Sequence, residues 1–404
     1  MSQTEVGRAP KMVLATVVAL GINAVLVQTV WSEDSSLKTL VRAAVLFVAV
    51  LTLVSTRVRL SRLLAILILL CASLLTLRGN PDQLSYLFVF VLVPVLASAD
   101  ERKLLKVLTL TSFLSLALIF GLLAAGLTQD QILMPRSRHN FGTASVPFFF
   151  NVVFGAAALA IVYAFKYRLR RRFLVLVSTV SMATVLFLAT DARGGFFALL
   201  GFVLVLSVVR PLSASYVFRT GVSCLPIVML GLALFLARYG SEVMANEFFS
   251  ARPLLYRQFL DRIGFEDLIL SSSVKRFDTG FEIVDNSYLH LIVGGGLLVG
   301  VAFVYLFARA TRHLFVLGRH VEIGFLIATC FYANSESILV RIENPFIIYA
   351  WYLIIRYGTT STDAESPKAR VARGIPNSAG RQARRLPVVT DAAVTAESSS
   401  RERF

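Results

Sequence analysis

The chain passes from one apolar segment of roughly 20 residues to the next, and this succession constrains its fold more than any other feature. A transmembrane helix needs about 20 mostly apolar residues, and only helices or closed barrels satisfy the backbone inside a bilayer. The segments are continuous and lack the alternation of barrel strands, so they predict helices. Hydrophobic residues make up 56% of the 404 residues and charged residues only 16%, a balance typical of a polytopic membrane protein.

The pattern predicts an all-α polytopic integral membrane protein with about twelve transmembrane helices. The expected spans are 12–31, 39–56, 60–77, 84–98, 104–126, 146–165, 173–190, 194–209, 215–237, 288–308, 321–340 and 344–357. Of these, 84–98 and 344–357 are the shortest. The first apolar run lacks a small-residue cleavage site, so we expect it to remain as a span.

One long polar stretch, residues 238–287, interrupts this transmembrane domain of residues 1–358. Loops of this length in a compact protein are usually functional or disordered, and its spaced apolar residues favour a folded, functional loop. After residue 358 the composition changes to Ser, Ala, Pro and Arg without apolar periodicity. We therefore expect residues 359–404 to form a disordered basic tail.

Lysine and arginine in the short connections predict the orientation, because cytoplasmic loops are enriched in both. The basic groups that fall on one side are 57–62, 102–106, 166–172, 210–219 and 309–319. This places both termini in the cytoplasm and the 238–287 loop in the periplasm. The net charge of +16 is then explained by topology and by attraction to anionic membrane lipids, not by nucleic-acid binding.

Three polar segments border spans on the expected outer side: 136–140, 190–195, and 252–262 together with 285–288. Each alone is explained equally well by an interfacial anchor or a helix cap. Together, their arginines form an anion site, because the guanidinium fork matches phosphate oxygens. The sequence holds neither a Gly-x-x-x-x-Gly-Lys nucleotide loop nor an Asp-x-Asp metal pair. A phosphate-bearing substrate that is already linked to lipid requires neither a nucleotide loop nor a metal or cofactor.

Several short motifs occur along residues 136–357, and their combination is informative. They are Thr190-Asp191-Ala192-Arg193-Gly194, the loop segment beginning Ser250-Ala251-Arg252-Pro253, Asp285-Asn286-Ser287-Tyr288 before a Gly-rich span, Arg138-His139-Asn140-Phe141-Gly142, and Asn334-Ser335-Glu336 with Asn344-Pro345-Phe346. This combination resembles the O-antigen polymerase and ligase superfamily (Wzy-type and WaaL-type) over residues 136–357. Ligases of this group carry a His-Asn pair where this chain has Asp285-Asn286, which favours a polymerase.

The resemblance implies a GT-C-like membrane glycosyltransferase of the bacterial inner membrane. Such an enzyme transfers a glycan from undecaprenyl diphosphate to an acceptor hydroxyl, without metal and with inversion. Its expected partners are undecaprenyl-diphosphate-linked glycans, membrane lipids, a chain-length regulator and a flippase, and no nucleic acid. An O-antigen ligase acting on lipid A-core and a transporter or flippase for the same lipids remain alternatives. The sugars, their linkage, the oligomeric state and the product (O-antigen, capsule or exopolysaccharide) stay open.

We expect specific residues to carry this chemistry. Those expected to bind the diphosphate or the glycan are Arg193 and Arg252, with Arg138 and Arg257 as weaker members, and the neighbouring Asn286 and Tyr288.

For the base that deprotonates the acceptor hydroxyl, the family position points to Asp285, and His290 is the second candidate. A histidine has the more suitable ordinary pKa. A single histidine on an apolar helix is, however, just as often a packing residue.

Overall fold

The computed structural model describes residues 9–30, 40–41, 43–49, 82–97, 99–133, 137–248, 251–272, 285–341 and 343–360. Contacts divide the chain into two units, Met1–Thr359 and Thr360–Phe404. The predicted span 60–77, part of the predicted span 39–56 and almost all of the predicted tail lie outside the described residues. All helices and strands of the described residues belong to the first unit.

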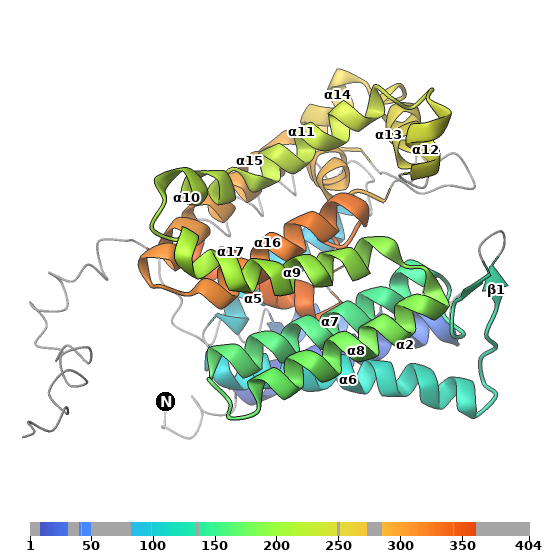
Figure 1. Ribbon diagram of the computed structural model, residues 1–404, viewed down its shortest axis with the longest axis vertical. Helices are drawn as coiled ribbons and strands as arrows, with labels where there is room; N and C mark the ends of the chain where they lie inside the picture. Colours follow the sequence, from blue (N-terminus) through green and yellow to red (C-terminus); the bar gives the residue numbers. More distant parts are fainter. Residues whose placement is uncertain are drawn as a thin grey trace, which may run out of the picture. The chain divides into compact units, whose positions relative to one another are not determined.

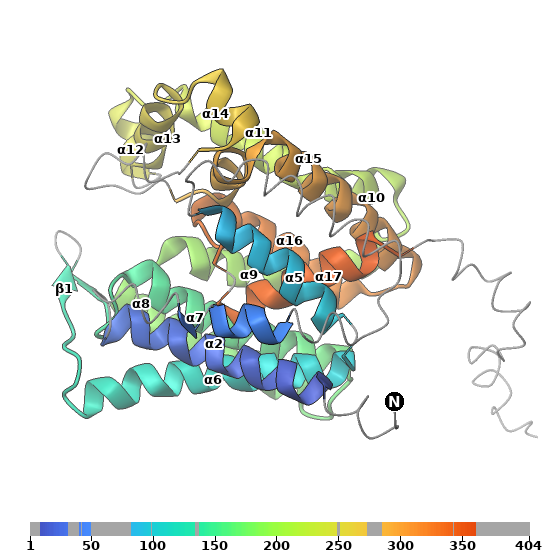
Figure 2. The same cartoon turned by 180° about the vertical axis from the view of Figure 1, so that it is seen from behind.

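The described part of this unit is built almost entirely from helices (Figures 1 and 2). In chain order the elements are α2 (Ala9–Thr29), α5 (Asp82–Leu96), α6 (Glu101–Ala124), β1 (Ile132–Leu133), β2 (Arg138–His139), α7 (Val146–Lys166), α8 (Arg172–Thr190), α9 (Arg193–Leu212), α10 (Tyr216–Ser223), α11 (Leu225–Ala237), α12 (Val243–Phe248), α13 (Arg252–Leu260), α14 (Phe265–Leu270), α15 (Ser287–Val316), α16 (His320–Ser335) and α17 (Pro345–Gly358). The short strands β1 and β2 pair antiparallel.

The number of predicted spans needs correction. Among the described residues, five helices are long and apolar enough to cross a membrane: α6, α7, α8, α9 and α15. The pair α10 and α11, bent by 62°, gives a sixth if it is one span. These are the helices of a multi-pass membrane protein, but they are not twelve spans.

Helix length explains three of the spans that are missing. The predicted spans at 84–98, 321–340 and 344–357 form helices of 15, 16 and 14 residues. At 1.5 Å per residue such helices reach only about 21–24 Å, less than the hydrocarbon thickness of about 30 Å. An apolar run in this sequence therefore predicts a buried helix. Such a helix can be buried inside the protein without crossing the membrane completely.

The helices of this unit lie in layers (Figures 1 and 2). Helices α9, α16 and α17 lie between α15 on one side and α7 on the other, and α15 packs along α17 while α16 packs along α9. Helix α7 is apolar on all sides and almost fully buried, which is typical of a central helix. Helix α8 instead leaves much of its apolar surface exposed, as expected for a helix that faces lipid.

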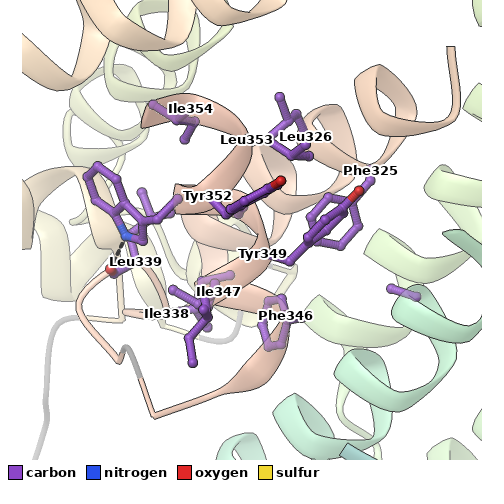
Figure 3. Packing of buried hydrophobic residues seen from close by; sticks show 14 of the residues in the cluster. Phe325, Leu326, Ile338, Leu339, Phe346, Ile347, Tyr349, Tyr352, Leu353 and Ile354 are labelled. Carbon is purple, nitrogen blue, oxygen red and sulfur yellow. Dashed lines mark hydrogen bonds between the residues drawn. The ribbon is translucent and has the colours of Figure 1, made fainter. Parts of the chain in front are cut away.

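The core is densest around α17, where almost every side chain is buried. Figure 3 shows Tyr349 and Tyr352 of this helix among aliphatic and aromatic neighbours. The indole Nε1 of Trp351 donates to the carbonyl of Leu339 at 3.0 Å, so its polar atom is satisfied inside the core. This bond also fixes the segment that connects α16 to α17.

The described part of the 238–287 loop contains the short helices α12, α13 and α14. Helix α13 packs on α11 and α15 through Tyr256 and Phe259, which are both buried. The chain after α14 lies against a break in α15 at Gly296, whose φ is 80°. A Cβ at this glycine would lie 3.2 Å from the carbonyl oxygen of Ile269, so the glycine permits both the break and the close approach.

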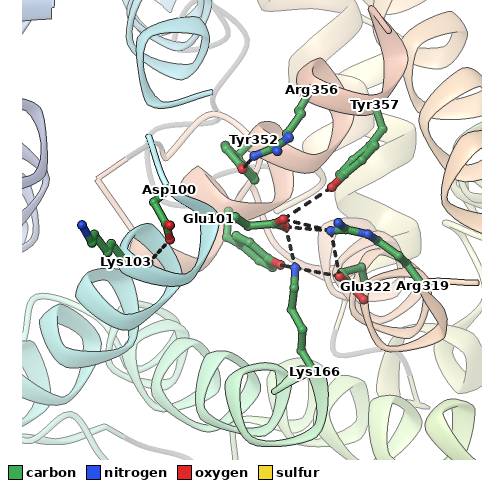
Figure 4. Close-up of polar contacts among 10 residues, drawn as sticks. Asp100, Glu101, Lys103, Lys166, Arg319, Glu322, Tyr352, Arg356 and Tyr357 are labelled. Atoms are coloured by element: carbon green, nitrogen blue, oxygen red, sulfur yellow. Dashed lines mark hydrogen bonds and ion pairs between the residues drawn. The ribbon is translucent and has the colours of Figure 1, made fainter. Parts of the chain in front are cut away.

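Four buried or half-buried charged residues join the ends of the helices opposite this loop, and we call them the charge cluster (Figure 4). The ammonium Nζ of Lys166 lies 2.5 Å from Glu101 Oε1 and 2.7 Å from Glu322 Oε1. The guanidinium of Arg319 contacts the same two carboxylates at 2.9 and 3.3 Å. Two positive and two negative groups compensate each other, which is the condition for burying them. The charge cluster thereby links α6, α7 and α16.

Candidate functional site

A cavity of about 150 Å³ lies where α7, α9, α13 and α15 begin and where α16 ends. Its charged lining residues are Arg138, Asp191, Arg193, Arg252, Asp285 and Glu336. Its apolar or small lining residues are Val146, Pro147, Phe150, Ala192, Gly194, Gly195, Leu255 and Tyr332. Helices α7 and α16 each run from this cavity to the charge cluster, so the two polar regions occupy opposite ends of these helices.

The turn between α8 and α9 brings two of the arginines together. Asp191 ends α8 in the left-handed conformation with φ of 46°, which a short polar residue tolerates. Its carboxylate accepts a hydrogen bond from Arg193 Nε at 3.0 Å and lies 3.9 Å from a guanidinium nitrogen of Arg138. Asp191 therefore positions both guanidinium groups at the cavity.

Glycines let α9 begin very close to its neighbours. A Cβ at Gly195 would meet the ring of Phe150 and lie 2.8 Å from the hydroxyl of Tyr332, and one at Gly194 would lie 2.5 Å from Ser335 Oγ. The backbone N–H groups in the first turn of this helix have no intrahelical acceptor and carry partial positive charge. The cavity thus receives the positive end of a helix in addition to the arginines.

Side chains of α13 and of the start of α15 donate hydrogen bonds to backbone carbonyls at the C-terminal end of α16. Tyr256 Oη donates to the Asn334 carbonyl at 2.8 Å, and Asn286 donates to the same oxygen at 3.0 Å. Ser287 Oγ donates to the Glu336 carbonyl at 2.6 Å. These bonds satisfy backbone groups that a helix end leaves open, and they fix α13, α15 and α16 relative to one another.

Arg252 is the arginine most closely integrated into this junction. Its Nη2 donates to the Ser335 carbonyl at 3.0 Å and lies 3.5 Å from Glu336 Oε1. Its buried Nε has no hydrogen-bond partner among the described residues. The guanidinium therefore retains a donor for a ligand while two of its contacts hold it in place.

Two carboxyl groups, Asp285 and Glu336, face the same cavity. Burial raises the pKa of Glu336, the negative charge of Asp285 raises it further, and Arg252 and Arg341 oppose the shift. Burial also raises the pKa of Asp285 against the effect of the same two arginines. Both carboxyls therefore keep a proton to higher pH than ordinary carboxyls do.

The cavity brings together four of the eight residues predicted from the sequence: Arg138, Arg193, Arg252 and Asp285. The other four do not line it. Arg257 is half exposed, lies 3.9 Å from Asp261 and lines a separate open hollow near Arg238.

His290 is half-buried one turn into α15, and its backbone carbonyl accepts a hydrogen bond from Tyr86. Asn286 caps α15 by accepting from the backbone N–H groups of Tyr288 and Leu289. The Tyr288 hydroxyl is buried and donates to the Cys330 carbonyl at 2.9 Å. Asn286 and Tyr288 therefore support the site without lining it.

Two charged residues that line the cavity, Glu336 and Asp191, were assigned no role from the sequence. For Glu336 a signal existed, because it lies inside the predicted span 321–340 and an ionisable residue inside a span is a functional candidate. Asp191 belongs to the tight turn that drew attention, but only its contacts reveal that it holds two arginines. Within the described residues, no group of three or more His, Cys, Asp or Glu side chains is arranged to hold a metal ion.

Comparison with known proteins adds no assignment: no protein-family model, no curated protein and no solved structure matches this chain.

Proposed function

We propose that this protein is a membrane glycosyltransferase that polymerises lipid-linked polysaccharide repeat units. It transfers a glycan from undecaprenyl diphosphate to the hydroxyl of an acceptor sugar, with inversion at the reacting carbon. The observation that carries the proposal is one cavity at the ends of apolar helices that contains three arginines and two carboxyls of raised pKa.

The arginines suit the diphosphate of the donor. Guanidinium groups stay charged and offer paired donors to phosphate oxygens. Arg138, Arg193 and Arg252 face three carboxyls, so the cavity gains a positive excess once a carboxyl retains a proton. The α9 N-terminus adds partial positive charge. These groups stabilise the negative charge that develops on the leaving diphosphate.

The size of the cavity suits the charged head of the donor, with the glycan extending beyond it. Its volume of about 150 Å³ is below the about 300–1,000 Å³ of typical small-molecule sites. Helix α13 of the polar loop provides Arg252 and Leu255 to the lining, so the loop is the natural neighbour of the glycan.

The carboxyls suit the acceptor. A sugar hydroxyl is a poor nucleophile until a base removes its proton, and a base works best when its pKa lies near the working pH. Asp285 and Glu336 are the two carboxyls of the cavity whose pKa is shifted in this direction.

The proposal includes an orientation in the bacterial inner membrane, with both termini in the cytoplasm and the cavity at the periplasmic face. Basic residues support it, because they concentrate at the helix ends opposite the cavity: Lys166, Arg172, Arg210, Arg219, Arg309, Arg312 and Arg319. Cytoplasmic ends carry such an excess. The lipid-linked glycan would then be delivered by a flippase, and a chain-length regulator would limit the polymer.

The test is reconstitution of the purified protein in liposomes with a glycan linked to undecaprenyl diphosphate. A ladder of longer lipid-linked glycans is the expected product on a carbohydrate gel. Gene deletion is expected to leave single repeat units in cells. Bare lipid A-core together with full-length polymer on undecaprenyl diphosphate would instead identify a ligase.

A transporter for the same lipids is the second candidate, because a pair of titratable carboxyls in a cavity also suits proton-coupled transport. Liposomes that carry a fluorescent lipid-linked glycan distinguish the two functions. Movement between leaflets without bond formation would support the transporter, and glycan transfer without such movement would support the polymerase.

A further inference from the structure

Glu336 lines the cavity, and its two carboxylate oxygens differ in their contacts. Its side chain is only 7% exposed, and its Oε1 lies 3.5 Å from Arg252 Nη2. Its Oε2 is buried and has no hydrogen-bond partner among the described residues. Leaving a buried polar atom without a partner is costly, so such an atom on a residue that lines a cavity points to a ligand that donates a hydrogen bond.

Side-chain hydrogen bonds hold the backbone around Glu336. Its carbonyl accepts from Ser287 Oγ, and the preceding carbonyl accepts from Arg252. The Ser287 hydroxyl oxygen also accepts from the Leu339 N–H at 3.1 Å. A catalytic group must be held in the productive geometry by such supporting contacts.

Asp285 differs from Glu336 in its surroundings. It is only half-buried, and it directly precedes the first turn of α15. Its backbone carbonyl lies 3.5 Å from the Tyr256 hydroxyl. Its negative charge raises the pKa of Glu336 across the shared cavity.

We infer that Glu336, through Oε2, removes the proton of the acceptor hydroxyl, and that Asp285 positions this reaction electrostatically without taking the proton. This inference rests on the proposed function. It places the hydroxyl of the acceptor sugar beside Glu336, to which that hydroxyl donates a hydrogen bond. It places the diphosphate of the glycan donor beside the arginines.

The reaction balances within the two substrates and this one side chain. The O–H bond of the acceptor breaks and its proton passes to Glu336 Oε2. The oxygen forms a bond to the reacting carbon of the donor glycan, and the bond from that carbon to the phosphate oxygen breaks. The electron pair of that bond leaves with undecaprenyl diphosphate, and Glu336 later returns its proton to water.

Several charged groups act on Glu336 from the elements packed around it. They are Asp285 before α15, Arg252 on α13, Arg341 after α16 and Arg138 on β2. Asp191 at the end of α8 and Arg193 at the start of α9 line the same cavity. The phenol of Tyr332 also faces the cavity. Removal of the Asp285 charge takes away a contribution that raises the Glu336 pKa, whereas the arginines that lower it remain.

The first test measures turnover in liposomes with Glu336→Gln, which keeps the size of the side chain but cannot take the proton. Turnover is expected to fall by about 100- to 10,000-fold, the usual contribution of general base catalysis. Binding of undecaprenyl diphosphate, measured by native mass spectrometry, should remain within a few-fold, because the arginines are intact. Glu242→Gln removes an exposed carboxylate of the 238–287 loop and serves as the matched control with unchanged turnover.

The second test is the pH profile of Asp285→Asn. The turnover of the unaltered protein should rise with pH as Glu336 ionises. In Asp285→Asn the rise should move to lower pH, and turnover should be retained at high pH. A merely structural role of Asp285 would lower turnover without moving the profile.

Three results would overturn the inference. Wild-type turnover in Glu336→Gln would show that Glu336 takes no proton, while the proposed function stands. Loss of turnover at every pH in Asp285→Asn would assign the base to Asp285. Absence of glycan transfer by the unaltered protein, with undecaprenyl diphosphate bound, would remove the proposed function and this inference together.

Discussion

Arg252 Nη2 lies 3.5 Å from Glu336 Oε1 and donates to the carbonyl of the residue just before Glu336. This contact joins the folded loop to the end of α16, two parts of the chain separated by more than eighty positions. One guanidinium therefore orients the candidate base and offers a donor to the candidate leaving group.

The two arginines of α13 are expected to differ in function. Arg252→Lys keeps the charge but removes the planar fork that contacts Ser335 and Glu336, so turnover should fall by about 100- to 1,000-fold, as for loss of an oxyanion donor. Arg257→Lys on the same helix should remain close to wild type, because Arg257 does not line the cavity. Reconstituted turnover measures both. Equal loss in both variants would contradict the assignment of the cavity.

Two glycines of α9 provide a second matched pair. Gly195→Ala places a methyl group against Phe150 and Tyr332, so it should displace the cavity wall and lower both lipid binding and turnover. Gly201→Ala meets nothing within 4 Å among the described residues and should stabilise the helix by up to about 1 kcal/mol. Thermal unfolding in detergent and binding of undecaprenyl diphosphate report these effects. An unimpaired Gly195→Ala variant would show that this wall is not part of the site.

The charge cluster should matter for stability and not for chemistry. Lys166→Met leaves Glu101 and Glu322 with one fewer cationic partner, and breaking a buried ion pair in this way costs about 3–5 kcal/mol. Adding Glu322→Gln to this variant should restore part of the loss, because it removes one of the two carboxylates. Lys103→Met, at an exposed position of α6, is the control. The measurement is the unfolding midpoint in detergent, and a midpoint unchanged by Lys166→Met would contradict the buried network.

The raised pKa of Glu336 also predicts how stability depends on pH. The folded protein binds this proton more tightly than the unfolded chain, so the group's contribution to the free energy of unfolding is complete at low pH. It is lost as the pH rises above the ordinary carboxyl range through the raised pKa. Glu336→Gln cannot lose a proton, so this part of the pH dependence should be absent from the variant. Identical pH dependence in both proteins would place the Glu336 pKa in the ordinary range.

Much of the fold follows from the sequence because the apolar runs are continuous. The predicted segments at 146–165 and 173–190 agree closely with α7 and α8. The number of spans does not follow from the sequence, because an apolar segment can be buried either by lipid or by other parts of the protein. Helix α17 is buried in protein on nearly every side, and its 14 residues are too short to cross a bilayer alone.

For the site, the sequence by itself determined which residue types lie at the polar ends of the helices. The sequence predicted a role for Arg138, Arg193, Arg252 and Asp285 in this way. Charged groups beside membrane spans are energetically costly and are therefore candidates for function. Only the tertiary structure decided which of them meet. Arg257 lies five residues after Arg252, about 140° around the same helix, and this rotation turns it away from the cavity. The sequence placed Glu336 inside a predicted span, but its partners come from the packing of α13 and α15 on the end of α16, which buries its carboxyl and brings it beside Asp285. A pKa shift of this kind depends on burial and on charges brought from other parts of the chain, and no local stretch of sequence contains either.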